Sequence, residues 1–205
     1  MDKIILDHFK NTDKLLYLTA IKVYKRAFKR INPEKNPNNY FLRLCREIIG
    51  QQLSGIVAEV VFTRFMRLYG NKITPNEIIK TSHEKLRGVG MSNAKAKYIK
   101  NLAQTVVDGK LPFEKFYRLE DHEIKKLLTQ VKGIGPWTAE MFLMFTLGRP
   151  DVFSYGDLGL GKAIKKIYGF KEGSNLRTVE KLARKWSPYK TYAALILWES
   201  LEEIE

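Results

Sequence analysis

Apolar residues recur at helical spacing along nearly the whole chain. The clearest early example lies in residues 12–31, where one stripe consists of Tyr17, Ile21, Tyr24, Phe28 and Ile31. No stretch of five or more residues alternates apolar and polar side chains as a half-buried strand does. The pattern therefore predicts an all-α fold.

Proline and glycine residues indicate where the helices begin and end. Two prolines within 31–39 break the first helix, and Gly50 and Gly70 each follow a long apolar stripe. Thr74 and Pro75 are typical of a helix cap and a first helical residue. Together these signals predict about ten helices, over 12–31, 39–50, 53–70, a short segment from 75, 92–107, 112–118, 120–130, 136–147, 158–168, 175–186 and 188–203.

No low-complexity linker divides the chain, so we expect a single domain over residues 1–205. The helices in the middle of the chain are expected to pack as one helical lobe. The N-terminal helix is expected to join the C-terminal helices in a second lobe.

Composition narrows the class of protein. Lys and Arg number 36 against 22 acidic residues, a net charge of +14, which favours a polyanionic partner such as nucleic acid over the alternative of merely solvated basic faces. A single cysteine, Cys45, excludes an internal disulfide and a four-thiolate cluster, and the histidines show no ligand spacing, so no catalytic metal is expected. No apolar stretch approaches the ~20 residues that span a bilayer, and no signal peptide is recognisable, so we expect a cytosolic protein.

The strongest local motif is a helix, a tight glycine turn and a second helix over about 121–147. The first helix has an apolar face, and Gly133 and Gly135 permit positive φ angles and close approach of another backbone. Pro136 suits the start of the second helix, whose exposed amides would form an anion site. A DNA phosphate fits there without any side chain, although a plain connector with capping glycines would look similar.

Four segments, in this order along the chain, favour the phosphate-binding hairpin over a plain connector. They read REIIGQQLS (46–54), LRGVGMSNAKAKYIKNLA (86–103), GIGPWTAEMF with DVFSYGDLGLGKAI (133–164), and WSPYKTYAALILW (186–198). Together they resemble the helix-hairpin-helix DNA glycosylase superfamily, and within it the alkylpurine, or 3-methyladenine, branch. This resemblance implies the helix-hairpin-helix glycosylase fold, with two helical lobes and a cleft between them.

The resemblance also assigns roles to residues. Asp157, twenty-two residues after Gly135, matches the catalytic aspartate of the superfamily. The hairpin glycines match the turn that grips a phosphate, where relatives often bind a monovalent cation through backbone carbonyls, here those of residues 131–135. Gln52 matches the side chain that fills the gap left by a flipped base. The implied base pocket contains Trp137, Met141 and Trp198, and the implied DNA-binding set contains Gln52, Ser54, Lys132, Gly133 and Gly135.

Some positions depart from the family pattern. Relatives often have a proline and an acid in the stretch occupied here by Ser154, Tyr155 and Gly156. Glu199 and Met141 stand where some relatives have pocket aromatics. The range of substrates is therefore left open.

The chemistry of alkylated purines suits these residues. An N3- or N7-alkylated purine is cationic, and an indole face attracts a cation by ~0.5–2 kcal/mol, so Trp137 and Trp198 could favour such bases unless both are core residues. Because a cationic base leaves readily, the enzyme chiefly needs a carboxylate that stabilises the developing charge on the sugar and orients water. Asp157 is the candidate, with helix capping near Leu158 as the structural alternative.

Trp137 separates this chain from the bifunctional relatives. Endonuclease III and the 8-oxoguanine glycosylases carry a nucleophilic lysine two residues after the second hairpin glycine, where this chain has an indole that cannot form a Schiff base. We therefore expect a monofunctional glycosylase that acts on duplex DNA with damaged bases, as a monomer, in the cytoplasm or with the DNA in a nucleoid or nucleus. The alternatives are a non-catalytic helix-hairpin-helix protein that binds damaged DNA and, with less support, a glycosylase/lyase. No cofactor is expected beyond the hairpin cation.

Other residues have simpler expected roles. Lys95, Lys97 and Lys100 lie in the GMSNAKAKYIK element and could contact phosphates or could be ordinary surface charges. We expect Cys45 in a helix core, and we expect His83 and His122 at solvated helix starts.

Overall fold

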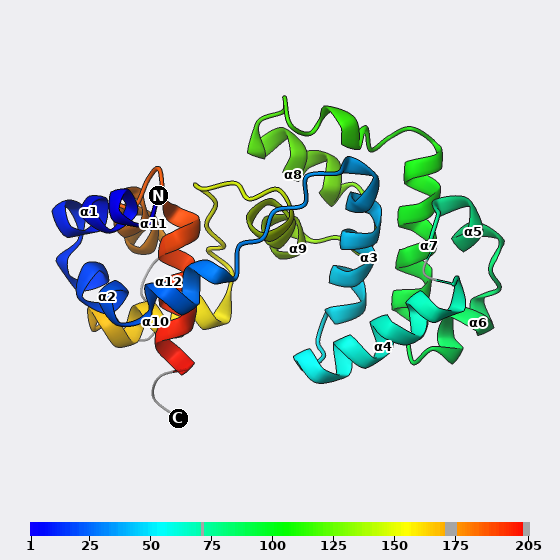
Figure 1. The fold of residues 1–205 in the computed structure, drawn as a ribbon, viewed down its shortest axis with the longest axis horizontal. Helices are drawn as coiled ribbons and strands as arrows, with labels where there is room; N and C mark the ends of the chain where they lie inside the picture. The colour runs from blue at the N-terminus through cyan, green and yellow to red at the C-terminus, as the bar shows by residue number, and fades with distance from the viewer. Residues whose placement is uncertain (71, 171–175, 203–205) are drawn as a thin grey trace. The chain divides into compact units, whose positions relative to one another are not determined.

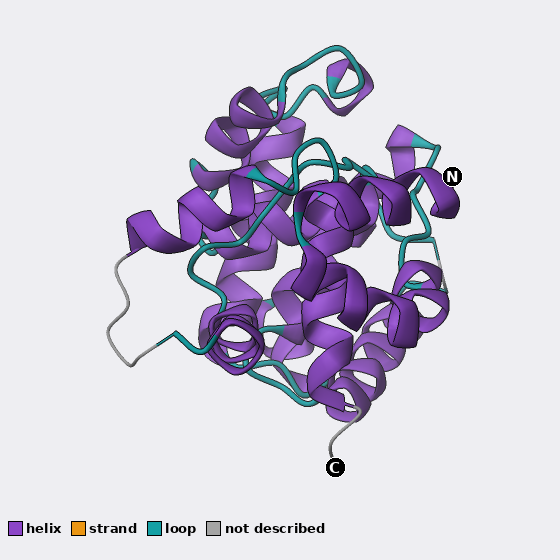
Figure 2. Ribbon diagram, turned by 90° about the vertical axis from the view of Figure 1, so that its left-hand side faces the viewer, coloured by secondary structure: helices purple, strands orange, loops and turns teal. Residues whose placement is uncertain are grey.

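The computed structural model describes residues 1–70, 72–170 and 176–202, and within them it contains helices and loops but no strand (Figure 2). The chain forms two compact units, one of Met1–Pro33 with Leu143–Glu205 and one of Glu34–Phe142. This grouping confirms the prediction that the N-terminal helix joins the C-terminal helices. The single domain over 1–205 stays a prediction.

The described residues of the first unit form five α-helices, labelled in Figure 1: α1 (Asp2–Thr12), α2 (Lys14–Lys29), α10 (Leu158–Tyr168), α11 (Leu176–Arg184) and α12 (Lys190–Glu202). Helix α12 is its centre, because every side chain from Thr191 to Leu197 is buried and the helix contacts both α2 and α10. A helix that is apolar on all sides in this way needs neighbours around it.

Helix α2 shows which apolar stripe faces the core. Its buried residues are Leu16, Ala20, Val23 and Ala27, whereas Ile21 of the predicted stripe is exposed. The helix was predicted correctly, but the buried face is the neighbouring stripe. Two alanines on that face let the backbone of α2 approach α12 closely, which larger side chains would prevent.

In the part of the second unit that the structure describes there are seven α-helices: α3 (Tyr40–Gly50), α4 (Gly55–Leu68), α5 (Pro75–Lys80), α6 (His83–Gly88), α7 (Asn93–Val107), α8 (Asp121–Thr129) and α9 (Pro136–Met141). Helix α7 contacts α3, α5 and α6, and Figure 1 shows it running between α3 and α5. Short turns complete the second unit, namely η1 (Pro37–Asn39) and η2 (Phe113–Lys115), and the π-helical turn η3 (Phe142–Thr146) follows α9 across the boundary between the units.

Most predicted helices are present, and the exceptions have physical reasons. The helix predicted over 112–118 is only the turn η2, because Phe113 and Phe116 pack as an aromatic pair, with ring centroids 5.3 Å apart, against Tyr40. The predicted helix over 136–147 divides into α9 and η3.

The sequence prediction did not identify α1 and α6. Helix α1 buries only Ile5 and Phe9, and α6 buries only Leu86, so neither has a stripe long enough to be recognised. The helix predicted over 175–186 is present as α11, while residue 175, like 203 of the last predicted helix, lies outside the described residues. None of the helices among the described residues combines the length and the apolar character that crossing a membrane requires.

Candidate active site and nucleic-acid interface

The glycine hairpin joins α8 to α9 in the second unit. Gly133 has φ +104°, and a Cβ placed there would lie 2.2 Å from Cγ of Tyr98. Two separate effects therefore disfavour any side chain at this position: the positive φ would strain the backbone, and the Cβ would clash with the Tyr98 ring. The positive φ predicted for Gly133 is confirmed.

Gly135 serves a different purpose. Its φ of −89° and ψ of 175° are ordinary extended values, so Gly135 does not adopt the positive φ that a glycine permits. It is the N-cap of α9, followed by Pro136 as the first helical residue, as predicted. No atom lies within 4 Å of a Cβ built on Gly135, so the exposed backbone at this point is open to another molecule.

The loop between α3 and α4 lies against this hairpin within the second unit. The Gln51 side-chain amide donates to the Gly133 carbonyl at 3.0 Å and to the Thr138 hydroxyl at 3.1 Å. Gln52 has φ +58°, a left-handed conformation that is uncommon outside glycine. A pocket of about 430 Å³ opens here, lined by Gln51, Gln52, Ser92, Ala94, Lys95, Tyr98, Gly135, Trp137 and Thr138.

A second, basic pocket lies beside the hairpin. It has a volume of about 670 Å³ and is lined by Asn93, Ala94, Lys97, Tyr98, Lys100, Asn101 and Lys132. Lys97 and Lys132 are exposed, and the ammonium of Lys100 donates to the Ile79 carbonyl at 3.2 Å. Three lysines are thus gathered at one concave surface next to Gly133, as an interface for a polyanion requires.

Lys95 was grouped with these lysines on the sequence alone. Its ammonium instead donates to the carbonyls of Ile49 and Gln51, at 2.8 and 2.5 Å. Burial lowers the pKa of Lys95 below its ordinary value. The structure therefore places this charge in a half-buried position against the C-terminal end of α3.

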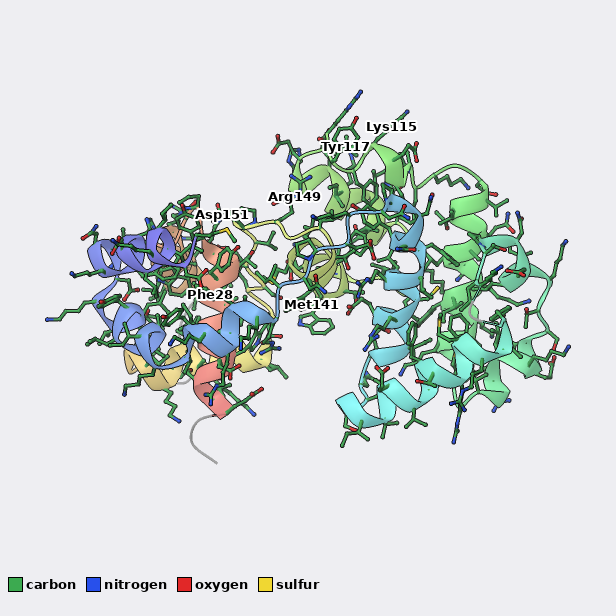
Figure 3. The ribbon with its side chains drawn as sticks, in the orientation of Figure 1. Phe28, Lys115, Tyr117, Met141, Arg149 and Asp151 are labelled. Carbon is green, nitrogen blue, oxygen red and sulfur yellow. The ribbon has the colours of Figure 1, made fainter. Side chains whose placement is uncertain are left out.

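The predicted pocket residues of the second unit differ in exposure. Trp137 is 42% exposed on α9, whereas Met141, one turn later and labelled in Figure 3, is buried at 4%. The Ser54 hydroxyl accepts from the Val57 N–H at 3.4 Å as the N-cap of α4. A DNA contact by Ser54 would have to share that hydroxyl.

Asp157, in the first unit, holds a rigid position at the start of α10. Its Oδ1 accepts the backbone N–H of Leu160 at 2.8 Å and Nε1–H of Trp198 at 2.9 Å. The helix cap that the sequence suggested is therefore present. This capping role is compatible with a catalytic role, because two donors on one oxygen hold the Asp157 carboxylate in a single orientation.

Trp198 is itself packed tightly. The Phe145 ring lies nearly parallel to the indole with centroids 6.2 Å apart, and the Arg30 guanidinium lies 5.9 Å from the indole centroid. A Cβ on Gly159 would approach the Asp157 Oδ1 to 3.1 Å and Trp198 Cδ1 to 3.2 Å. The close fit between α10 and α12 thus depends on a glycine two residues after Asp157.

Glu199 follows Trp198 and is buried at 5% exposure. Its carboxylate pairs with the guanidinium groups of Arg26, at 2.8 Å, and Arg30, at 3.9 Å, both from α2. A buried carboxylate needs such partners because desolvation otherwise disfavours its charge. Sequence reasoning missed both arginines; their i, i+4 spacing on α2 was visible, but their partner is about 170 residues away.

Cys45 is buried as predicted, and burial raises the pKa of its thiol. His122 is exposed at the start of α8, as predicted. His83 lies at the start of α6 but is half-buried rather than solvated, and it hydrogen-bonds Asn93.

Known proteins resemble most of this chain. The family described as HhH-GPD superfamily base excision DNA repair protein matches residues 45–188. DNA-3-methyladenine glycosylase 1 of Schizosaccharomyces pombe is 32% identical over 83% of this chain and 76% of its own length. The crystal structure of a DNA-3-methyladenine glycosidase from Bacillus halodurans is 35% identical, covers 94% of this chain and 93% of its own, and superposes with a TM-score of 0.74. The structure of the S. pombe 3-methyladenine DNA glycosylase in complex with abasic DNA is 31% identical, covers 85% and 88% of the two chains, and has a TM-score of 0.70.

Proposed function

Because this chain belongs to the HhH-GPD superfamily of base excision DNA repair proteins, we propose that it is a monofunctional DNA glycosylase that hydrolyses the N-glycosidic bond of alkylated purines in DNA. The first substrates to consider are 3-methyladenine and 7-methylguanine, since relatives at 31–35% identity are named as 3-methyladenine glycosylases or glycosidases. The observation that supports the proposal is that the Leu160 N–H and the Trp198 indole N–H hold the carboxylate of Asp157, the residue to which the sequence resemblance assigns the catalytic role.

The chemistry would begin with extrusion of the damaged base, because a base inside the duplex cannot be reached. Departure of the base leaves positive charge on the sugar. The Asp157 carboxylate would stabilise that charge and orient the water that attacks the sugar. A carboxylate already held by two N–H donors needs little reorganisation at that moment.

The base pocket is proposed to contain Trp137, Met141 and Trp198. An indole face attracts a cationic base, and Trp137 is partly exposed. Trp198 is packed against Phe145 and Arg30, so its contribution would include the orientation of Asp157. The buried thioether of Met141 would supply apolar surface behind the base.

Duplex DNA is the proposed partner of a monomeric enzyme, acting in the cytoplasm or wherever the DNA lies. The open backbone at Gly135 and the neighbouring hairpin would take a phosphate, and Lys132 would add charge beside it. Gln52 would fill the gap left by the flipped base, with Ser54 next to it at the start of α4. The net charge of +14 supports attraction to the DNA backbone.

A monovalent cation bound by backbone carbonyls of residues 131–135 is proposed as the only further group at the hairpin. The Val131 carbonyl accepts the N–H of Ile134 at 3.0 Å, and the Gly133 carbonyl accepts the Gln51 amide. A carbonyl oxygen has two lone pairs, so both groups retain one for a cation. Replacing potassium by tetramethylammonium should weaken duplex binding if the cation contributes.

One assay tests the main proposal. The chain is incubated with methylated duplex DNA, and the released bases are identified by chromatography. We expect 3-methyladenine and 7-methylguanine in the supernatant and an abasic strand that remains intact. Tight binding to an abasic duplex without release of any base would instead favour a non-catalytic protein that binds damaged DNA.

A further inference from the structure

The loop that carries Gln52 is bound to the rest of the second unit on both sides of that residue. Gln52 itself has φ +58°, which an L-residue adopts only when its surroundings enforce it. The turn begins with the Leu53 N–H donating to the Gly50 carbonyl at 3.1 Å, and Ser54 then caps α4. The Gln52 side chain is exposed, so its own contacts do not enforce the backbone conformation.

Lys95 supplies one of the two anchors. Its ammonium donates to the carbonyls of Ile49 and Gln51, which belong to the last turn and the C-cap of α3. Carbonyls at a helix C-terminus lack intrahelical partners, and a positive charge there also complements the helix dipole. The Gln51 carbonyl belongs to the peptide group that precedes Gln52, so this bond acts directly on the φ rotation of Gln52.

Gln51 supplies the other anchor. Its side-chain amide donates to the Gly133 carbonyl and the Thr138 hydroxyl. The same residue is thus bound by its backbone to α7 through Lys95 and by its side chain to the hairpin. The next residue along the chain, Gln52, lines the pocket of about 430 Å³ together with Lys95 and Trp137.

We propose that Lys95 is a positioning residue for Gln52: it holds the peptide before Gln52 in the left-handed turn, so that the Gln52 side chain is ready to fill the gap left by a flipped base. This assignment rests on the proposed function. It gives Lys95 a role different from that of Lys97 and Lys100 on the same helix, which line the basic pocket.

A simpler role would be general support of the packing between α3 and α7. The two roles predict different effects of a Lys95 substitution on base excision. General support should matter equally whether or not Gln52 is present, and equally for every substrate. A positioning role should matter only through Gln52, and most where the lesion is still paired, because extruding an unpaired base requires less free energy.

The experiment is a double-mutant cycle with Lys95→Met and Gln52→Ala. Single-turnover excision of 7-methylguanine is measured in two duplexes, with the lesion opposite cytosine or opposite an abasic site. We expect Lys95→Met to lower the rate about tenfold opposite cytosine, a size typical of coupled neighbouring residues, and to change it by less than about twofold in the Gln52→Ala background. Opposite the abasic site the loss should also be small.

Two further variants serve as a matched control and as a conservative replacement in this cycle. Lys97→Met removes an exposed lysine from the same helix and should not show the dependence on Gln52. Lys95→Arg keeps donors that can reach two carbonyls and should recover most of the rate. If Lys95→Met does not fold, Lys95→Gln, with a shorter donor, takes its place in the same cycle.

The outcomes are distinguishable. Equal slowing by Lys95→Met with and without Gln52, or equal slowing on both duplexes, overturns the assignment of Lys95 and leaves the proposed function intact. A wild-type chain that releases no methylated base from either duplex overturns the proposed function and this inference with it.

Discussion

The indole Nε1 of Trp198 donates a hydrogen bond to Oδ1 of Asp157 at 2.9 Å, joining residues that are 41 positions apart in the chain. The same oxygen accepts the Leu160 N–H at 2.8 Å. A hydrogen bond to a charged group contributes about 1.5–3 kcal/mol, and here both bonds also fix the direction of the carboxylate. Trp198 is therefore important as a hydrogen-bond donor as well as an aromatic surface.

The first prediction concerns that donor. Trp198→Phe keeps an aromatic ring but removes the N–H, so the Asp157 carboxylate should lose part of its orientation. We expect the single-turnover excision rate to fall by about tenfold, the equivalent of one hydrogen bond to a charged group. The rate is measured on a methylated duplex at saturating enzyme.

Trp186 provides a matched control in the same unit. Its Nε1 donates to the buried Asp13 carboxylate at 2.8 Å, far along the chain from Asp157. Trp186→Phe should lower the thermal unfolding temperature while leaving the excision rate of the folded protein nearly unchanged. If both tryptophan variants reduce the rate equally, the effect is one of stability, and Trp198 has no special link to the chemistry.

The second prediction concerns Asp157. Asp157→Asn retains a side chain that can cap α10 but removes the charge, so the variant should fold and bind an abasic duplex. Its single-turnover rate should fall by ~10² to 10³, as for the loss of one preorganised electrostatic group. The loss should be larger for a neutral base such as hypoxanthine than for 7-methylguanine, whose own charge assists departure.

Asp151 is the control carboxylate for this test. Asp151, which is labelled in Figure 3, accepts a hydrogen bond from the Ser187 hydroxyl at 2.7 Å and pairs with the Lys190 ammonium at 3.2 Å. These contacts hold its loop to the start of α12. Asp151→Asn should therefore affect stability more than chemistry. Near-normal excision of hypoxanthine by Asp157→Asn would contradict the catalytic role.

Much of the fold and of the proposed site could be predicted because the signals are local. The stripes of long helices, the glycine hairpin and the QQLS and GDL segments lie within short windows of sequence. Partners at long range were not visible. The sequence indicates the charge of Lys95 but not that its ammonium is bound to the carbonyls of Ile49 and Gln51.

The buried face of α2 illustrates a second limit. Large apolar residues suggested the stripe through Ile21, yet the helix buries Ala20 and Ala27, because close packing on α12 requires small side chains. Size alone does not reveal which of two apolar stripes faces a neighbour. Gln51 was overlooked for a similar reason, since its two acceptors lie 82 and 87 residues away.

The third prediction concerns the reaction product. The sequence resemblance aligns Trp137 with the lyase lysine of bifunctional relatives, and an indole cannot form a Schiff base. The protein should therefore leave an intact abasic strand, and borohydride should trap no covalent adduct. Trapping of the wild-type chain through the hairpin would contradict the monofunctional assignment.

The last prediction separates the two hairpin glycines. Gly135→Ala adds a methyl group with no atom within 4 Å and at ordinary backbone angles, so the unfolding temperature should stay the same. If a DNA phosphate approaches this backbone, the added methyl group should hinder it, and the affinity of the Gly135→Ala variant for an abasic duplex should fall by about tenfold. That is the size expected for the loss of one hydrogen bond to a charged group. Gly133→Ala should instead destabilise the fold by about 2 kcal/mol or more, because its Cβ would meet the Tyr98 ring at 2.2 Å and its φ is +104°.

Thermal unfolding and fluorescence anisotropy are measured for both variants over a range of salt concentrations. Unchanged DNA affinity in Gly135→Ala would mean that the phosphate binds elsewhere, and the basic pocket with Lys97, Lys100 and Lys132 would then be the next surface to test.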